Sequence, residues 1–254
     1  SKKNGLKIKG NIQIGEVPAS TFNLRRSIML LASGNKPYGE FTFDGVEDTW
    51  EGDYIGANDA TLVLALKNGA TWTGAKESNG NLDLTLNNNG IWNNTSENAT
   101  TVNKLSGKGG FVRMDEASAD MTIKDYSGAT TFIYRHNADN DILGGNVNIQ
   151  KAADGSVVNV RTNSIGTSDK EEVANVLKAL AAKMIAGDNA KGTLKGEAQI
   201  AEGIVTSASA LKVGNIDFAN GTGVLDEESI TARYPDSGYI YGDSETAMMK
   251  GAKS

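Results

Sequence analysis

The strongest constraint on the fold is a repeat of 20 residues in the first half of the chain. The segment 62–72 (LVLALKNGATW) aligns without a gap on the segment 82–92 (LDLTLNNNGIW). The identical pairs are Leu62/Leu82, Leu64/Leu84, Leu66/Leu86, Asn68/Asn88 and Trp72/Trp92. Trp50 precedes Trp72 by 22 residues, which extends the spacing one unit further back. A fixed period of this length is typical of a solenoid, in which each unit packs mainly on its neighbours.

Each unit reads as a strand of alternating leucines, a corner rich in asparagine and glycine, and a second short strand. Leucine at every second position gives the strand one apolar face. Propeller blades need about 40 residues per unit, and leucine-rich repeats follow an L-x-x-L-x-L frame that is absent here. We therefore predict an all-β fold, a right-handed parallel β-helix. In it Leu64 stacks on Leu84 and Trp72 on Trp92, with strands about 4.8 Å apart.

One amphipathic helix is predicted to interrupt the coils, near 168–186. Ser168 and Glu171 match a capping box, and Gly187 is a suitable C-terminal stop. The apolar positions at helical spacing are Val173, Val176, Leu177, Leu180, Met184 and Ile185. We expect this stripe to face the core, covering a wall of the solenoid or sealing a join. The predicted organisation is thus β-helix coils over 1–165, the helix within 166–190, and further coils over 191–254.

Composition excludes several classes of function. The chain of 254 residues has no cysteine and one histidine, His136, which removes thiolate metal sites and makes a Ser-His-Asp triad improbable. The formal net charge of −6 and the lack of a basic stripe argue against nucleic acid as a partner. No run approaches the roughly 20 apolar residues of a membrane helix. We expect the chain to be a piece of a longer protein, because both ends read as polar boundaries.

A second signal lies between about Thr71 and Asn163. The residues that carry it are those of 69–74 (GATWTG), 89–92 (NGIW), 102–114 (VNKLSGKGGFVRM), 141–145 (DILGG) and 157–160 (VVNV). This run resembles the pattern W…N-x-L-x-G-x-G-x-F-x-M…D-x-L…G of passenger domains of pertactin-like bacterial autotransporters (type V secretion). In that family the coils end in a cap-like segment. Here the segment corresponding to the cap, about 71–163, is followed by the predicted helix and by further residues.

The resemblance implies a right-handed β-helix displayed on the bacterial cell surface, on the extracellular side of the outer membrane. It also implies export through a C-terminal β-barrel of the same full-length chain, and folding assisted by the cap-like segment. We expect an adhesin or a stalk whose loops bind a host or neighbouring-cell surface protein or glycan. We expect no enzymatic activity and no catalytic, metal-binding or cofactor-binding residues. The alternatives are a polysaccharide-active β-helix enzyme, either a lyase or a glycosidase, and a structural spacer without a ligand.

The best candidate for chemistry is the polar segment 135–141, RHNADND. One interpretation makes Asp139 and Asp141 calcium ligands or acid/base groups. The favoured interpretation is a solvated turn in which Asp141 accepts hydrogen bonds from backbone amides. His136 is expected to be an ordinary surface side chain.

Other polar clusters are interpreted as turns. Glu47, Asp48, Glu51 and Asp53 surround Trp50, and a further acidic group covers 226–228. The glycine clusters at 107–110, 144–145 and 221–223 lack the Lys-Ser/Thr and helix that a phosphate-binding loop requires. We therefore expect no nucleotide site.

The tryptophans allow two interpretations. Stacked inside, Trp50, Trp72 and Trp92 form a buried aromatic ladder. Stacked outside, they form a strip that binds sugar or protein. Their apolar neighbours favour the interior. Tyr234, Tyr239 and Tyr241 form a separate candidate contact loop.

Overall fold

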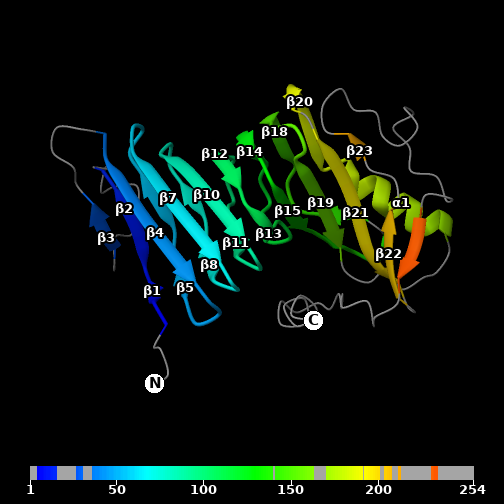
Figure 1. Ribbon diagram of the computed structural model, residues 1–254, viewed down its shortest axis with the longest axis horizontal. Helices are drawn as coiled ribbons and strands as arrows, with labels where there is room; N and C mark the ends of the chain where they lie inside the picture. The colour runs from blue at the N-terminus through cyan, green and yellow to red at the C-terminus, as the bar shows by residue number, and fades with distance from the viewer. Residues whose placement is uncertain are drawn as a thin grey trace.

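The fold is a parallel β-solenoid, described here from a computed structural model (Figure 1). The structure describes residues 5–15, 27–30, 36–139, 141–162, 170–190, 192–200, 203–207, 211–212 and 230–233. Strands from successive coils lie side by side along the long axis of the molecule, and each pairs with the equivalent strand of the next coil (Figure 1). The predicted all-β parallel β-helix with one helix is confirmed.

One side of the solenoid, here called the leucine face, is a parallel ladder of long strands. Its members in order are β4 (Tyr38–Asp44), β7 (Thr61–Lys67), β10 (Asn81–Asn87), β12 (Thr100–Ser106), β14 (Met121–Tyr126), β18 (Val147–Ala152) and β20 (Met184–Ala190). Leu64 pairs in register with Leu84, as the repeat predicts. The leucines of β7 and β10 are buried and the residues between them are half-buried, so one face of each strand lines the interior.

The second side, here called the tryptophan face, follows each leucine-face strand after a short corner. Its parallel ladder is β1 (Lys7–Lys9), β5 (Thr49–Glu51), β8 (Thr71–Gly74), β11 (Ile91–Asn94), β13 (Lys108–Arg113), β15 (Ala129–Ile133), β19 (Val157–Thr162) and β21 (Thr193–Ile200). Trp50, Trp72 and Trp92 occupy one register column of this ladder.

The third side is shorter and less regular. Its parallel strands are β3 (Ser27–Leu30), β2 (Asn11–Ile14), β6 (Tyr54–Gly56) and β9 (Lys76–Glu77). In the next described coils, residues 95–99 and 114–120 replace a strand. One coil later, the third side carries an antiparallel hairpin of β16 (Arg135–His136) and β17 (Ile142–Leu143). The periodicity seen in the sequence therefore belongs to two sides of the solenoid and not to the third.

The tryptophans form the interior ladder that the sequence favours. All three are fully buried. The ring centroids of Trp50 and Trp72 lie 4.6 Å apart and those of Trp72 and Trp92 4.5 Å apart, with the planes nearly parallel. Each indole N–H donates to a glycine carbonyl of the preceding coil: Trp50 to Gly10, Trp72 to Gly52 and Trp92 to Gly74. A buried indole thus keeps its hydrogen bond, which removes the main penalty for placing it in the core.

A ladder of amides fixes the corner between the leucine and tryptophan faces. The Asn88 Nδ2 atom donates to Asn68 Oδ1, and Asn68 Nδ2 donates to Asp44 Oδ1, both at 2.7 Å. Asn68 and Asn88 have φ values of 56° and 40°, in the left-handed region that asparagine tolerates better than most residues. The repeated asparagine therefore serves both the backbone bend and the link between coils.

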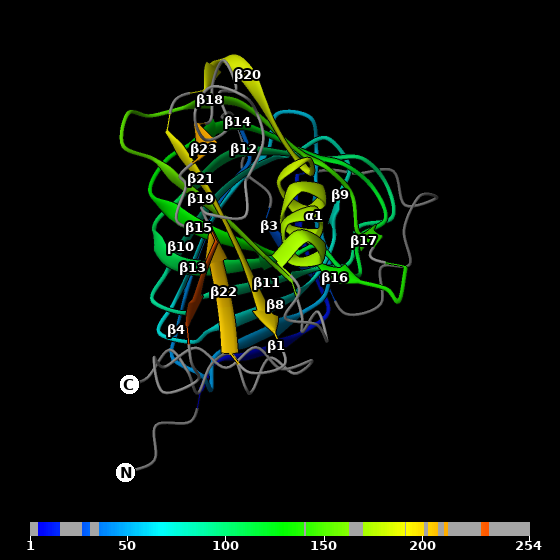
Figure 2. The ribbon, with the colours of Figure 1, turned by 90° about the vertical axis from the view of Figure 1, so that its right-hand side faces the viewer.

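The helix α1 (Lys170–Ala181) packs on the end of the solenoid, against β19 and β21 (Figure 2). Val176, Leu177 and Leu180 are fully buried, whereas Glu172 and Lys178 are exposed. The expected core-facing stripe is therefore present in the described part of the helix, and it seals an end of the stack. Ser168, the expected cap residue, lies outside the described residues.

The helix ends earlier than the sequence predicts, and the assignment of helix to 182–186 is wrong. Met184 and Ile185 belong to β20, where Met184 is buried and Ile185 is 43% exposed. Gly187 is not a helix stop, because it lies in an irregularity of the β18–β20 ladder. The physical reason is that pairing with β18 satisfies the backbone groups of these residues, and Met184 takes the register position beside buried Val147.

After β21 the described strands no longer add parallel coils. β22 (Gly203–Ser207) and β23 (Leu211–Lys212) pair antiparallel with β21, and β24 (Ile230–Arg233) pairs antiparallel with β22. Within 191–254, the range predicted to form further coils, β21 continues the parallel ladder, and most of the range lies outside the described residues. Among the residues that the structure covers, no helix has the length and apolar character that crossing a membrane requires.

Candidate functional site

A polar pocket opens where the third side turns into the leucine face. Its volume is about 230 Å³. Two lysines line it, Lys76 from β9 and Lys124 from β14. The neutral polar residues of its wall include Ser78, Asn81, Thr101 and Asn103. Three successive coils thus contribute to one concave surface.

Lys76 is the unusual member of this group because it occupies an interior position. In the β6–β9 ladder it pairs in register with Tyr54, which is fully buried, and Lys76 itself is only 6% exposed. Its ammonium donates to the carbonyl oxygen of Ser78 at 3.1 Å. No ion pair to a carboxylate is found for Lys76 among the described residues. A buried lysine in this state is rare, since desolvation of the charge is unfavourable unless it is compensated.

The electrostatics of the pocket follow from this burial. Desolvation, together with the positive charge of Lys124, lowers the pKa of the Lys76 ammonium to about 8, and the carboxylate of Glu77 acts in the opposite direction. Burial also raises the pKa of the Glu77 carboxyl, with Asp53 and Glu97 adding to the effect. At neutral pH, which is below this pKa, the Lys76 ammonium keeps its charge, and it lines the same pocket as Lys124.

A break in the strand pattern shapes the wall of the pocket. Between the inward-facing Val102 and Leu105 of β12, two residues in succession, Asn103 and Lys104, lie outside the core. Asn103 Nδ2 donates to Asp83 Oδ1 at 2.6 Å, so the carboxylate of Asp83 is engaged by a neighbour. Leu84 accordingly pairs with Leu105, at a separation of 21 residues, where the preceding pair is separated by 20.

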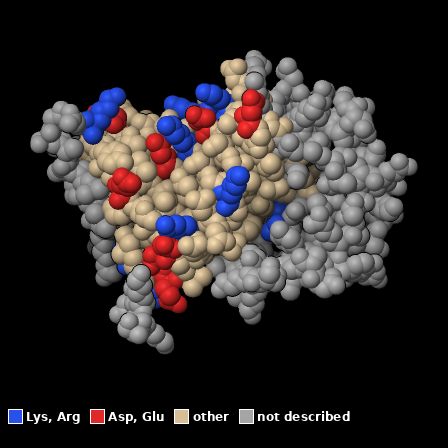
Figure 3. Space-filling model, in the orientation of Figure 1, with Lys and Arg blue, Asp and Glu red and all other residues tan. Residues whose placement is uncertain are grey.

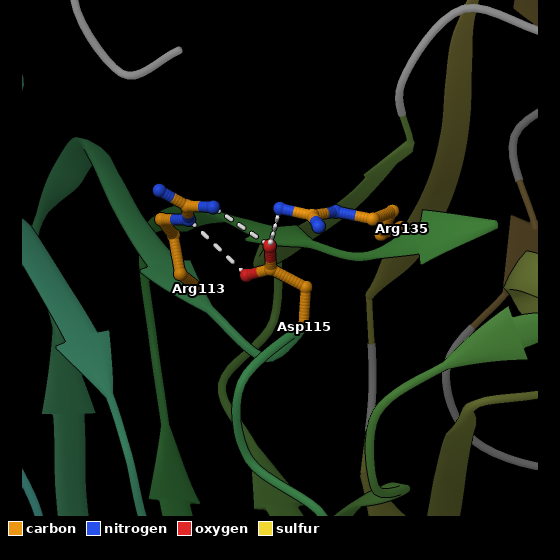
Figure 4. A network of polar contacts seen from close by, with 3 residues as sticks. All are labelled: Arg113, Asp115 and Arg135. Carbon is orange, nitrogen blue, oxygen red and sulfur yellow. Dashed lines mark hydrogen bonds and ion pairs between the residues drawn. The ribbon is translucent and has the colours of Figure 1, made fainter. Parts of the chain in front are cut away.

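A second charged group, outside the pocket, links the coil of β13 to the coil of β16. Asp115, whose side chain is 3% exposed, accepts hydrogen bonds from Arg113 Nε at 3.1 Å and from Arg113 at 2.7 Å through a terminal nitrogen. Arg135 approaches the same carboxylate at 3.3 Å (Figure 4). Two guanidinium groups converge on one acid, which fixes the segment after β13 against β16. This is a structural clamp, since its only carboxylate is already occupied.

The described residues of the polar segment 135–141 form β16 and the turn after it, and not a clustered acid site. Asn137 Oδ1 accepts the backbone N–H groups of both Asp139 and Asp141 at 3.0 Å. The side chain that accepts the backbone N–H groups of this turn is therefore that of Asn137, whereas the sequence predicted Asp141 in this role. Both aspartates are exposed. Among the described residues, no group of three or more His, Asp or Glu side chains is arranged to hold a metal ion.

The expectation that His136 is a surface side chain is wrong. The residue is 8% exposed, and its Nδ1 lies 2.9 Å from the Thr162 hydroxyl of β19. The reason is tertiary: the β16–β17 hairpin turns His136 against a strand 26 residues later in the chain.

The acidic residues around Trp50 divide into exposed and structural ones. Glu47 and Glu51 are exposed. Asp48 accepts the N–H groups of Leu6 and Asp44, and Asp53 accepts that of Ala75 at 2.9 Å, so both hold adjacent coils. Of the glycines at 107–110, Gly107 directly precedes β13, and Gly109 and Gly110 belong to its first residues. The groups at 221–223 and 226–228, and Tyr234, Tyr239 and Tyr241, lie outside the described residues.

Sequence reasoning missed the two lysines of the pocket. Lys76 follows the strand Thr71–Gly74 by only two residues, and no short-range pattern marks it as buried. Lys124 alternates with apolar residues of β14 as any exposed strand residue does. The available signal was the slip of the repeat near Val102, which marks the place where coils stop being equivalent.

Comparisons with protein-family models, with curated proteins and with solved structures find no match to this chain.

Proposed function

We propose that this chain is a segment of a surface-displayed autotransporter passenger that acts as a stalk or adhesin. The observation that carries the proposal is the interior stacking in register between neighbouring coils, leucine on leucine on one face and tryptophan on tryptophan on the other. Because each coil supplies the apolar partner of the next, the stack behaves as one elongated body that presents its side loops at fixed spacing.

The outer surface supports the same proposal. On the face shown in Figure 3, the lysine, arginine, aspartate and glutamate side chains are interspersed without a large region of one sign. Several ion pairs of the described residues are exposed on both sides, such as Lys7–Glu47 and Lys9–Glu51 at 3.9 Å. Such a surface is well solvated, as a protein held outside the cell requires.

Surface display is tested on cells that express the complete reading frame containing this chain. An antibody raised against the purified chain should label intact cells, and external protease should remove the label. A cytoplasmic protein of the same cells serves as the control that must stay unlabelled until the cells are permeabilised. Labelling of this chain only after permeabilisation contradicts the proposal.

The enzyme alternative has a separate test. Hydrolysis of glycosides uses a pair of carboxylates, and among the described residues that line the pocket there is no aspartate or glutamate. The purified chain is incubated with a panel of polysaccharides, with and without calcium, and reducing ends and unsaturated products are measured. We expect no product. Product formation above the level of a heat-denatured sample replaces the adhesin proposal with an enzymatic one.

A further inference from the structure

The pocket lined by Lys76 and Lys124 has properties that the solenoid itself does not require. A solenoid interior is stabilised by like apolar residues, yet here a lysine lies in the register column of a buried tyrosine. Replacement of buried charge by an apolar side chain is often stabilising. The presence of the ammonium beside a cavity of about 230 Å³ therefore points to a use for the charge.

We infer that this pocket binds a carboxylate-bearing sugar, such as a uronic acid, with the carboxylate between Lys76 and Lys124 and the hydroxyl groups on the neutral polar wall. The site does not depend on surface display, so it can be tested on the purified chain whatever the fate of the proposed function.

Charge supports an anionic ligand. Both lysines line the pocket, and within the part of the chain that the structure describes Lys76 has one hydrogen bond, to Ser78, so its ammonium keeps donors for a ligand. The nearest acid on the wall strand β10, Asp83, is engaged by Asn103. An anion placed here gains charge-assisted hydrogen bonds in a partly desolvated setting, where they are stronger than in water.

Size and wall chemistry support a single polyhydroxylated ring. The volume lies below the roughly 300–1,000 Å³ of pockets for drug-sized ligands, so the bound group is small. Asn81, Asn103, Thr101 and Ser78 offer amide and hydroxyl groups, which both donate and accept. This mixture matches sugar hydroxyls, whereas a phosphate ion presents acceptors almost alone and makes no use of the acceptors on the wall.

The first experiment is calorimetric titration of the purified chain at pH 7 with three probes. D-glucuronate is the expected ligand, D-glucose its neutral match, and inorganic phosphate the test of a general anion site. We expect glucuronate to bind at least about tenfold more tightly than either control, a difference of about 1.4 kcal/mol. Equal binding of glucose, equal binding of phosphate, or no binding of glucuronate in monomer or oligomer form overturns the inference.

An oligoglucuronate arm distinguishes the source of the ligand. Tighter binding of the oligomer than of the monomer identifies a residue within a glycan chain, and equal binding identifies the free sugar acid. Both results support the carboxylate-sugar site.

Substitutions connect binding to the two lysines. Lys124→Gln removes an exposed charge and should weaken glucuronate binding about tenfold, whereas Lys151→Gln on β18, outside the pocket, should leave it unchanged.

Lys76→Met keeps the length of the side chain and should abolish measurable binding while far-UV circular dichroism stays unchanged. Should Lys76→Met misfold, Thr101→Val tests the polar wall instead, with an expected loss of severalfold. Unchanged affinity in the folded variants overturns the site.

The pH dependence provides a further readout. The charged groups facing Lys76 are Lys124 from β14 and Glu77 from β9. Glucuronate affinity should fall as the pH rises through about 8, because the Lys76 ammonium loses its proton there. Affinity that is constant from pH 7 to pH 9.5 contradicts the proposed role of Lys76.

Discussion

The leucine and tryptophan faces differ from the third side of the same coils in how regularly their residues repeat from one coil to the next. On the two regular faces, inward-facing apolar side chains meet apolar side chains one coil away, as Leu64 meets Leu84 and Trp72 meets Trp92. On the third side, Lys76 meets Tyr54, and residues 95–99 supply no strand to cover it. Repetition therefore gives rigidity where it holds, and a polar pocket forms where it stops.

The largest effect should come from breaking the tryptophan column. Trp72→Ala removes the middle ring of the stack and is expected to lower the free energy of unfolding by about 4 kcal/mol. Trp72→Phe retains an aromatic ring but loses the hydrogen bond to Gly52, so its loss should be smaller. The measurement is guanidinium denaturation followed by tryptophan fluorescence and circular dichroism. A loss of under about 1 kcal/mol for the alanine variant would show that the column does not hold the coils together.

The next largest effect concerns Lys76: loss of its charge should raise the free energy of unfolding, whereas loss of Trp72 should lower it. The pKa of Lys76 is lower in the folded chain than in the unfolded one, so below pH 8 its charge destabilises the fold. As the pH rises from about 8 towards 10 the folded chain releases this proton while the unfolded chain retains it, and stability should increase. The full difference is about 3 kcal/mol, since one pKa unit corresponds to about 1.4 kcal/mol.

Lys76→Met should therefore be more stable than the parent at pH 7 and should lose this rise with pH. Lys124→Met, which alters an exposed lysine of the same pocket, is the matched control and should gain little. The urea midpoints of the three proteins at pH 7 and pH 9.5 check this. A parent protein whose stability is flat or falling between pH 8 and 9.5 relative to Lys76→Met contradicts the assigned burial of the charge.

A smaller effect is expected at the amide ladder of the regular corner. Asn68→Ala removes its side-chain hydrogen bonds with Asp44 and Asn88 and places alanine at positive φ, for an expected loss of about 2 kcal/mol. Asn68→Gly relieves the backbone strain, so the difference between the two variants measures the conformational part. Thermal and urea unfolding give both values. Equal stability of the parent and the two variants would show that the amide ladder does not contribute to the stability of the regular faces.

The smallest effect should be found on the outer surface. Lys67 lies 3.6 Å from Asp44, and both side chains are about half exposed. Exposed pairs of this kind contribute little, so Lys67→Gln should change stability by under about 0.5 kcal/mol. A loss comparable to that of Asn68→Ala, measured in the same unfolding experiment, would mean that surface charge and not interior stacking sets the stability of the regular faces.

Much of the fold could be predicted because its information is local and repeated. The leucine alternation at Leu62–Leu66 and its copy 20 residues later specify two strands, their inward faces and their register. The same spacing places the tryptophans in one column. The end of the helix could not be predicted in this way, because Met184 fits both a helical stripe and an alternating strand, and pairing with β18 decides between them.

The candidate site was less predictable than the fold. His136, Asp139 and Asp141 are conspicuous in the sequence, yet Asn137 organises that turn and His136 is buried against Thr162. Lys76 and Lys124 are separated by almost 50 residues and share no motif. They line one pocket because the coil path returns to the same corner on each turn.

The repeating unit, the inward face of its strands and the stacking of Leu64 on Leu84 and Trp72 on Trp92 follow from the amino-acid pattern alone, because a period-two pattern copied at a fixed interval leaves few other ways to bury leucine and tryptophan. Three further outcomes follow from contacts between distant segments: which polar residues are buried, where α1 ends and β20 begins, and which lysines line the pocket. These outcomes depend on the competition between desolvation, strand pairing and contacts between distant residues, and short stretches of sequence do not contain that information.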